Sequence, residues 1–543
     1  YIIIEASKDE LSIIPDFSGR VDLFYTQKKN KFKLSNNIKD LTPFISRKIN
    51  YPALAHSLSI YGFRSPKKNT IFDEINRVPV KAIVKIKRHL TIEETQFHPR
   101  KIKNNIKIND FYDCFMNSIE NRASKNGNFL SLSSGWDSTS ILAALIKIKG
   151  KRKISCFIGR MKFSKKSEII NNFEIARAKK IAQYYNVNLK IVDLDYTKKS
   201  SRNSVSSYIN VLKKYHLVSL PAINQMKLCE KISKNYNGET LFTGEGSDGL
   251  QNFGFSQYAT LYQDNSRDFR EYSDKMMSYL FGPTFLEKIF KGKAKNDLIY
   301  NFLKREKNIN TSNFKINKKE ILNDIFISFF LRNIRFPNSS ADTLKFLTNR
   351  GKKNYQDYFL NNYFKKHIDN FDLKKLYSYY LFSYRSFHWQ SSTSLSRDYS
   401  ADTFGINISH PFLDNDLVNF FSEVPENWGR GLDLNNTKYA LKSILKNKLD
   451  YPYYLQEGPH SYTYDVQPGF SIVNEFLNNS ALKSFFIEKL DKVKVKDYYD
   501  KKFFDIKYIL ILLKKYKNNQ SLDNNEVRDL SSLIYHSNYF YDE

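Results

Sequence analysis

The sequence predicts an α/β fold: a doubly wound parallel sheet with a helical insertion, preceded by a smaller β-rich domain. Between residues 109 and 243, strand-like and helix-like hydrophobic patterns alternate, which is typical of successive βαβ units. Before residue 100 the patterns are short and strand-like, whereas residues 255–395 carry long, aromatic, helical patterns. A chain of 543 residues is also long for a single hydrophobic core, so several structural units are expected.

The first hundred residues indicate short strands joined by turns. Their patterns predict strands at Leu11–Ile14, Val21–Thr26, Lys31–Leu34 and Val80–Ile86, and a short helix at Ala53–Tyr61. From residue 109 the period becomes that of an amphipathic helix, and the alternating series follows. Its expected strands are Phe129–Leu132, Ile154–Ile158, Leu189–Leu194 and Thr240–Thr243, and its expected helices are Thr139–Ile148, Phe173–Tyr185 and Ile223–Tyr236. Later helices are expected at Ile321–Leu331, Leu373–Phe387, Val473–Phe476 and Tyr508–Leu513.

The charge and cysteine content narrow the classes of function. The chain carries 86 Lys and Arg against 56 Asp and Glu, a formal net charge of +30. Its lysines are scattered in pairs and form no stripe, so nucleic acid is not expected to be the main substrate. Three cysteines without a C-x-x-C pair cannot build a disulfide framework, which predicts a reducing, cytoplasmic location. No run of 18 apolar residues exists, so no transmembrane helix is expected.

A short polar loop separates the first expected strand of the parallel sheet from the helix that follows. It reads Leu132-Ser133-Ser134-Gly135-Trp136-Asp137-Ser138-Thr139. Small residues let backbone N–H groups face an anion, and the helix N-terminus adds the positive end of its dipole. Asp137 would repel phosphate unless a divalent cation lay between them, so it favours Mg²⁺. Taken alone, the loop fits a serine-rich helix cap equally well.

A second polar loop shifts the balance toward a ligand site. Thr243-Gly244-Glu245-Gly246-Ser247-Asp248 follows the fourth expected strand. The alternative is a tight acidic turn. Because ligands bind at the carboxyl ends of the strands in a doubly wound sheet, two such loops on neighbouring strands favour a nucleotide site.

With these motifs the sequence resembles the asparagine synthetase family of PP-loop ATP pyrophosphatases, which includes β-lactam synthetases and lasso-peptide cyclases. The first loop corresponds to S-G-G-x-D-S, with Ser134 in place of the first glycine. The second corresponds to S-G-E-G-S-D-E, with Gly249 in place of the last acid. The family's P-F-L-D is intact at Pro411-Phe412-Leu413-Asp414, and its K-x-x-L-R reads Lys438-Tyr439-Ala440-Leu441-Lys442. In the downstream P-x-x-[IL]-x-x-R-P-K, Pro452, Leu455 and Pro459 remain, whereas Gly458 replaces the arginine and His460 the lysine.

The N-terminal part resembles part of the family's Ntn-type glutamine amidotransferase domain. Asp16-Phe17-Ser18-Gly19 with Leu23-Phe24-Tyr25 is similar to the D-x-x-G-x-x-P-L-Y-Y hairpin, and Gly62 with Thr70–Ile75 is similar to the following linker. Glutamine-dependent members begin with a catalytic Cys, whereas residue 1 here is Tyr and the first cysteine is Cys114. The sequence as given is therefore not expected to hydrolyse glutamine. Either an upstream segment carries that Cys, or the substrate brings its own amine.

The resemblance implies a reaction and a set of roles. ATP would bind in the cleft of the sheet, a substrate carboxylate would attack its α-phosphorus to release pyrophosphate, and a nitrogen nucleophile would displace AMP. Ser133, Ser134, Gly135 and Ser138 would cradle the pyrophosphate, Asp137 and Asp248 would hold Mg²⁺, and the backbones of Leu132, Ile158 and Gly244 would frame the adenosine. Glu245 would position or deprotonate the amine, and His460 or Lys442 would face the departing pyrophosphate. Asp414 is expected to be only a helix N-cap.

The expected organisation has three parts. Residues 1–100 form a partial amidotransferase-like domain without its N-terminal Cys, residues 101–470 an ATP pyrophosphatase domain with its insertion at 255–395, and residues 471–543 a C-terminal helical region. The main expectation is an asparagine-biosynthesis type ligase for a small-molecule or peptide carboxylate, with ammonia or an amine as nitrogen donor and a homodimer as one oligomeric state. A peptide or natural-product amide synthetase or cyclase, a degenerate nucleotide-binding homologue and a PP-loop RNA-modifying enzyme stay open.

Overall fold

A computed structural model describes residues 2–540 of the chain. It leaves out residues 17–18, 29–30, 60–63, 88, 218, 255–269, 307, 333, 340–343, 390–392, 457–470 and 492–494. Within the described residues the expected mixed α/β class is confirmed, with a parallel sheet, many helices and a β-rich N-terminal part.

The central sheet is parallel and has the strand order β10-β9-β8-β11-β12. Its strands are β8 (Asn128–Ser131), β9 (Ile154–Lys162), β10 (Asn188–Asp195), β11 (Thr240–Phe242) and β12 (Asn407–Ser409). The chain builds outward from β8 to β10, then crosses to the other side of β8 and continues with β11 and β12. The direction of building therefore reverses between β8 and β11, where doubly wound sheets bind their ligands.

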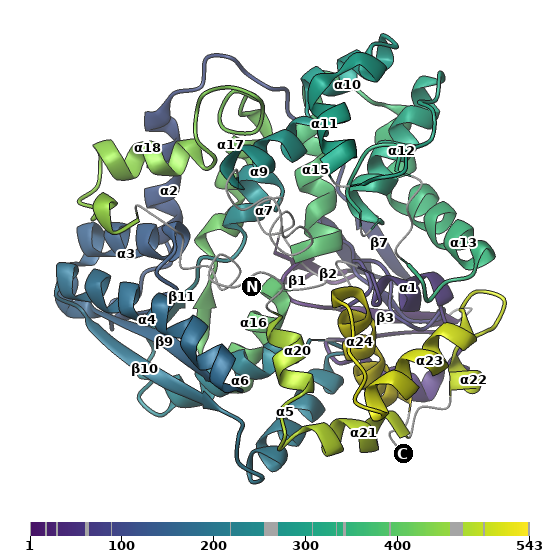
Figure 1. Cartoon of the computed structure of the whole chain (residues 1–543), viewed down its shortest axis with the longest axis horizontal. Coiled ribbons are helices and arrows are strands. Elements are labelled where there is room, and N and C mark those ends of the chain that lie inside the picture. Colours follow the sequence, from purple (N-terminus) through teal and green to yellow (C-terminus); the bar gives the residue numbers. More distant parts are fainter. Residues whose placement is uncertain are drawn as a thin grey trace.

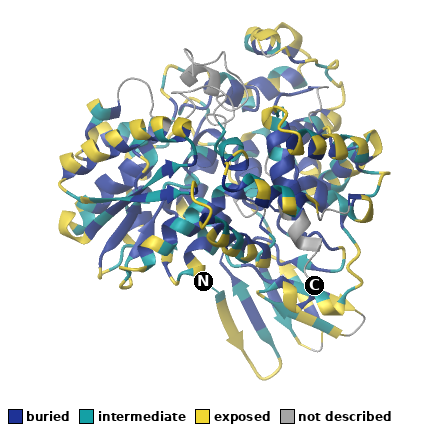
Figure 2. Cartoon of the chain, turned by 60° about the horizontal axis from the view of Figure 1, so that its bottom comes forward, coloured by how far each residue is buried: buried dark blue, intermediate teal, exposed yellow. Residues whose placement is uncertain are grey.

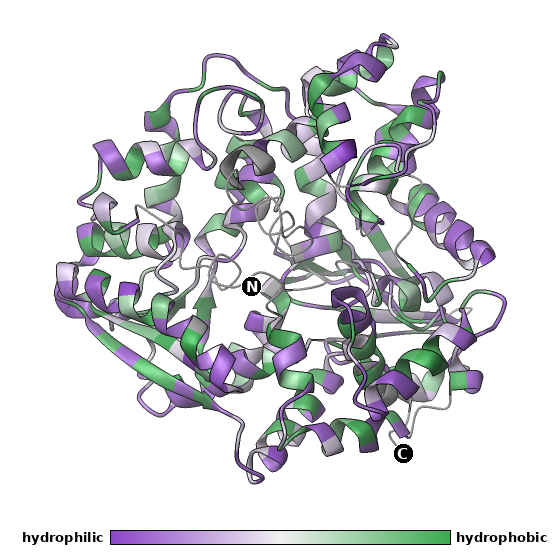
Figure 3. Cartoon of the chain, in the orientation of Figure 1, coloured by the Kyte–Doolittle hydropathy of each residue, from purple (hydrophilic) through white to green (hydrophobic). Residues whose placement is uncertain are grey.

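Helices connect and cover these strands. They are α2 (Ile108–Glu120), α3 (Trp136–Lys149), α4 (Lys165–Tyr185), α5 (Ser201–Lys214), α6 (Leu220–Ser233) and α7 (Ser247–Asn252). Consecutive residues of β8 and β11 are buried, so both faces of these strands are covered. Figure 3 shows hydrophobic residues along the strands and hydrophilic ones on the outer turns of the helices. The sequence missed α5 and β12, the latter because three residues with two polar side chains give no strand pattern.

The N-terminal part consists of two antiparallel sheets. One has the order β1-β2-β6-β7 and the other β4-β3-β5. The strands are β1 (Ile2–Ala6), β2 (Leu11–Pro15), β3 (Phe24–Lys28), β4 (Lys31–Ser35), β5 (Asn76–Arg77), β6 (Ala82–Ile86) and β7 (Leu90–Glu94), and the helix α1 spans Tyr51–His56. The strand expected from Val21 begins only at Phe24, and in Figure 2 the projecting β1 is exposed along most of its length.

The remaining described helices form an aromatic assembly and a C-terminal group. The first set is α9 (Arg270–Tyr279), α10 (Pro283–Phe290), α11 (Leu298–Glu306), α12 (Lys318–Phe330), α13 (Asn349–Phe359), α14 (Lys365–Asp369), α15 (Leu376–Tyr384), α16 (Thr393–Thr403), α17 (Asn415–Glu423) and α18 (Tyr439–Asn447). The C-terminal group is α20 (Ile472–Leu477), α21 (Lys483–Asp491), α22 (Val495–Tyr498), α23 (Ile506–Lys517) and α24 (Asn524–Phe540). In Figure 1 the parallel sheet lies at the left and the C-terminal group at the lower right.

One expected helix is divided in the structure. The sequence predicted a single helix at Leu373–Phe387, but a 3₁₀ turn precedes α15 and a π-helical turn, Arg385–Trp389, follows it. The hydrophobic pattern continues through all three because α15 and the first residues of the π turn, Arg385–Phe387, are buried nearly all round, so periodicity alone does not separate them.

A buried ion cluster ties the N-terminal part to α16. Asp22 accepts from Arg64, from Lys67 (2.9 Å), from Arg77 (2.9 Å) and from the Tyr399 hydroxyl of α16. Burial alone would raise the pKa of Asp22, but the charges of Arg64, Arg77 and Lys67 hold it well below its usual range. This buried cluster holds the β-rich part against α16.

Two expectations about cysteine and membranes can be compared with the structure. Cys114, Cys156 and Cys229 are all free thiols, as the spacing predicted. Of the helices in the described part of the chain, none combines the length and apolar character that crossing a membrane requires.

Candidate active site

The two loops singled out in the sequence meet where β8 and β11 end. Leu130 pairs with Phe242, so both strands finish at one edge of the sheet. A Cβ built on Gly244 would lie 3.1 Å from the Asp137 Cβ and 3.2 Å from the Ser138 backbone nitrogen. The second loop therefore packs directly on the first turn of α3, and a side chain at residue 244 would require these neighbours to shift by a few tenths of an ångström.

The first loop leads from the sheet into the N-terminus of α3. Leu132 continues the sheet by donating its N–H to Phe157 O (2.9 Å). Ser133 is exposed, and both its backbone N–H and its hydroxyl lie 3.1 Å from Ser138 Oγ, which closes the loop. Gly135, the N-cap of α3, has no side chain to cap the first turn. The loop thus combines hydroxyls with the N-terminal end of a 14-residue helix.

Ser134 has a backbone conformation that glycine adopts more readily. Its φ is +60°, in the left-handed region, and its side chain is fully buried. Gln456 donates to its carbonyl oxygen at 2.9 Å. Ser134 replaces the first glycine of the S-G-G-x-D-S pattern. Its positive φ accounts for the glycine that the pattern has at this position.

The centre of the site is an ammonium group shared by two carboxylates. Lys438 Nζ lies 2.8 and 2.7 Å from the two carboxylate oxygens of Asp137 and 2.7 Å from Asp248 Oδ1. Ser247 donates a further hydrogen bond to Asp137 Oδ1 (2.6 Å). Burial and the neighbouring Asp248 raise the pKa of Asp137 against the opposing effect of Lys438. The two carboxylates, in turn, raise the pKa of Lys438 although burial opposes this.

These two carboxylates suit a magnesium ion that phosphate oxygens help to coordinate. Mg²⁺ is commonly held by one or two protein carboxylates together with substrate phosphates. Asp137 and Asp248 fit, because oxygens of both already converge on one cationic atom. Among the described residues no group of three or more His, Cys, Asp or Glu is placed to hold a metal alone. Substrate phosphates would therefore complete such a site.

The loop before α18 places Lys438 with a positive φ of 58°. Arg430, fully buried, donates to Leu250 O (2.8 Å) and Gln251 O (2.9 Å) in α7, the helix that carries Asp248. Lys275 of α9 donates to Asn435 O at 2.6 Å. The loop that carries Lys438 is thus held to α7, the helix that carries Asp248.

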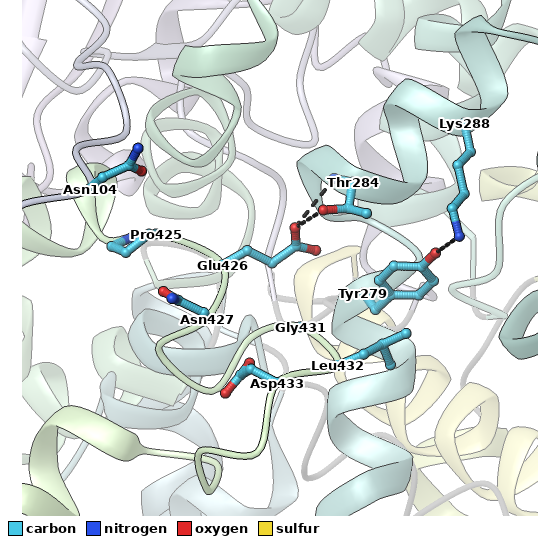
Figure 4. A pocket seen from close by; sticks show the side chains of 10 residues that line it. All are labelled: Asn104, Tyr279, Thr284, Lys288, Pro425, Glu426, Asn427, Gly431, Leu432 and Asp433. Atoms are coloured by element: carbon cyan, nitrogen blue, oxygen red, sulfur yellow. Dashed lines mark hydrogen bonds between the residues drawn. The ribbon is translucent and has the colours of Figure 1, made fainter.

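Behind this loop lies a cavity of about 470 Å³ (Figure 4). Glu426 points across it toward Thr284 at the start of α10 and accepts the Thr284 hydroxyl at 2.5 Å. Burial raises the pKa of Glu426. The carboxylate braces the loop against α10, and no residue of the two strand-end loops lines this cavity.

Glu245 belongs to the second loop, and its carboxylate is already paired. Its Oε1 lies 3.1 Å from Arg397 of α16, and Arg397 also reaches Gln225 Oε1 at 3.3 Å. The start of the same loop is held by a second pair of side chains. Thr243 Oγ1 lies 2.6 Å from His410 Nδ1, and His410 Nε2 lies 3.0 Å from Asp398 Oδ1.

Other predicted site residues have different positions. The pairing of β8 with β9 ends at Ser131 and Phe157. Ile158 is the next residue of β9 after that last pair. Lys442 Nζ lies 5.3 Å from the centroid of the Trp136 ring, at the start of α3. His460, with Gly458 and Pro459, lies outside the described residues.

Asp414 is an N-cap, as the sequence suggested. It caps α17 by accepting from the Asp416 N–H (2.8 Å), and it also pairs with Arg122 (2.6 Å). Sequence reasoning missed the central position of Lys438 and the contacts of Arg397 and His410. Lys438 is the first residue of the K-x-x-L-R motif, and this motif could have marked it as a site residue. Arg397 and His410 lie outside the motifs described above.

Comparisons with known proteins give one strong and one weak result. A family model described as asparagine synthase matches residues 113–505. No curated protein matches the chain. Among solved structures, a glutamine-dependent NAD+ synthetase from Acinetobacter baumannii in complex with ADP is similar at 14% identity, with a TM-score of 0.20. That match covers 35% of this chain and 34% of the other, so the chain spans about a third of that protein's length.

Proposed function

This chain belongs to the asparagine synthase family, a family of ATP-dependent amide ligases, and we propose that it activates a carboxylate as an acyl-adenylate and joins it to ammonia or an amine. The observation that supports this most is the meeting of two strand-end loops where the strand order reverses. Asp137, Asp248 and Lys438 converge there. ATP is the substrate that this combination of anion-binding loop and paired acids suits best.

Different groups of the chain have different roles toward ATP. The hydroxyls of Ser133 and Ser138 and the N-terminal end of α3 bind the outer phosphates. A magnesium ion held by Asp137 and Asp248 would neutralise phosphate charge as pyrophosphate leaves. Lys438, placed between those carboxylates, supplies a fixed positive charge beside the leaving group, where preorganised charge lowers the barrier.

The second half-reaction needs a carboxylate beside the activated carbonyl. Glu245 has the right chemistry to orient or deprotonate an amine, but Arg397 holds it at 3.1 Å. A substrate carboxylate that enters beside Arg397 draws the guanidinium toward itself and releases Glu245 for the amine. The pair Asp398–His410 keeps Thr243, and with it the start of the Glu245 loop, in place.

The test is to identify the products formed from ATP. The full chain is incubated with ATP, Mg²⁺ and a panel of carboxylic acids, beginning with aspartate as required for asparagine synthesis, and with hydroxylamine to trap acyl-adenylates as hydroxamates. The proposal predicts AMP and pyrophosphate with at least one acid, and loss of both products in Asp137→Asn and Asp248→Asn. Formation of ADP and phosphate would contradict it.

A degenerate nucleotide-binding homologue is the second candidate, favoured by the Glu245–Arg397 pair and by serine at residue 134. It predicts ATP binding without AMP release with any acid. If product forms without any added nitrogen donor, from an acid that supplies its own amine, the enzyme is a cyclase. If product forms only with RNA, the enzyme modifies RNA.

A further inference from the structure

A second cavity, of about 340 Å³, lies between the N-terminal sheet and helices α15 and α17. Its lining includes the basic side chains of Lys81, His98, Arg100 and Arg385, and none of its described lining residues is Asp or Glu. It shares no residue with the loops at 132–138 and 243–248. A cavity with this lining favours an anionic ligand.

Arg385 is the buried member of this basic group. Only 2% of it is exposed, and it begins the π-helical turn after α15, a rare feature that often marks functional sites. Its Nη1 donates to Asn415 Oδ1 (3.3 Å) at the start of α17. Burial lowers the pKa of Arg385 to about 9, although Asp16 and Asp414 act in the opposite direction. The lowered pKa reflects the cost of burying a charged guanidinium, a cost that an anion bound beside it would offset.

Among the described residues that line the cavity, the charged side chains are all basic. Burial and the charges of Arg385 and Arg100 lower the pKa of Lys81. Glu423, which follows the lining on α17, is shared by Arg100 (2.9 Å) and Lys103 (2.6 Å). One carboxylate outside the lining thus serves two cations, Arg100 of the lining and Lys103.

Part of the wall is aromatic. Phe97 and Phe382 stack with their ring centroids 4.1 Å apart and their planes at 22°. Lys81 Nζ lies 5.8 Å from the centroid of the Phe97 ring, so the cationic and apolar parts of the wall adjoin. The volume also exceeds what a bare phosphate ion fills.

We propose that this cavity binds a small organic phosphate, with the phosphate facing Lys81, Arg100 and Arg385 and the organic group lying against Phe97 and Phe382. Three cations suit a doubly charged phosphate better than a single carboxylate. The site is distinct from the proposed ATP site, and its occupation does not depend on the reaction proposed above.

The experiment is a calorimetric titration of the full chain with phenyl phosphate, using inorganic phosphate, benzoate and phenol as comparison probes. The proposal predicts saturable 1:1 binding of phenyl phosphate, weaker binding of inorganic phosphate and benzoate, and none of phenol. Lys81→Gln and Arg100→Ala should each weaken binding about tenfold, the effect of losing one charge-assisted hydrogen bond. Lys103→Ala is the matched control, since it removes the other partner of Glu423 without touching the cavity.

The remaining variants locate the ligand. Asp248→Asn should bind phenyl phosphate as the wild type does, because Asp248 belongs to the other site. Equal weakening by Lys103→Ala and Arg100→Ala would show diffuse surface attraction and overturn the proposal. Equal affinity for benzoate would overturn the phosphate assignment, and absence of saturation at millimolar phenyl phosphate, or weakening by Asp248→Asn, would overturn the site. Circular dichroism of each variant confirms that it is folded.

Discussion

Lys438 forms an ion pair with Asp248, with Nζ 2.7 Å from Oδ1, while the same nitrogen also reaches both oxygens of Asp137. One cation thus serves two partly buried carboxylates. Burial and the nearby charge of Asp248 raise the pKa of Asp137, whereas Lys438 opposes this. A site in this state is ready for an additional cation that arrives with a ligand.

The first prediction concerns the removal of that cation. Lys438→Met should lower the free energy of unfolding by about 3 kcal/mol, because it leaves two partly buried carboxylates facing each other. Adding Asp248→Asn should restore part of the loss, since one of the repelling charges disappears. Urea denaturation of the single and double variants measures both effects. Strictly additive losses would contradict the shared-cation arrangement.

The second prediction concerns the backbone at residue 134. Ser134→Gly should be more stable than Ser134→Ala by about 1 kcal/mol, because a non-glycine residue in the left-handed region carries a steric cost of that order. Both variants lose the hydroxyl, so their difference isolates the backbone. Equal unfolding midpoints in urea would show that φ at this residue is not strained.

The third prediction tests the contact between the two loops. Gly244→Ala should destabilise the fold by about 1–2 kcal/mol and weaken ATP binding, because its Cβ overpacks against Asp137 and Ser138. Gly135→Ala is the control for stability. The nearest atom to its Cβ would be Ser133 Oγ at 3.7 Å, and its φ is −77°, so its unfolding midpoint should be nearly that of the wild type. If the two variants unfold alike, the close packing of the loops is wrong.

The fourth prediction is a loss of stability in mild acid. Burial lowers the pKa of five histidines to about 3 or 4, namely His56, His216, His367, His388 and His536. The folded state keeps them neutral, whereas the unfolded chain takes up protons below about pH 6.5. Stability is therefore complete above that pH and falls below it, by roughly 1 kcal/mol per histidine for each pH unit. Thermal unfolding at pH 7 and 5.5 should show a large drop in Tm, and an unchanged Tm would contradict the burial of these rings.

The sequence predicted the parallel sheet because short segments rich in apolar residues alternate with segments of helical periodicity. Ile154–Ile158 and Leu189–Leu194 were located in this way, with errors mainly at their ends. It did not predict β12, where Asn407 and Ser409 give no apolar signal and pairing with β11 alone defines the strand.

For the candidate site, too, local sequence patterns were informative and long-range contacts were not predicted. Residues that lie in strand-end loops, such as Asp137 and Gly244, could be found from local motifs. The partnership of Lys438 with both acids could not, because it depends on the path of the loop held by Arg430 and Lys275. Arg397 reaches Glu245 from a helix outside every recognised motif. Long-range ion pairs are set by tertiary packing and leave no periodic trace in the sequence.

The separation of Asp137 and Lys438 by 301 residues has a consequence for synthesis of the protein. A ribosome releases both strand-end loops long before it reaches the lysine that neutralises them. During that interval the two carboxylates lie near each other without the ammonium group of Lys438. Their mutual repulsion then opposes the packing of the two loops at this edge of the sheet. Closure of this edge must therefore wait for the loop before α18, and chains that stop short of it are expected to be the ones that chaperones and proteases retain.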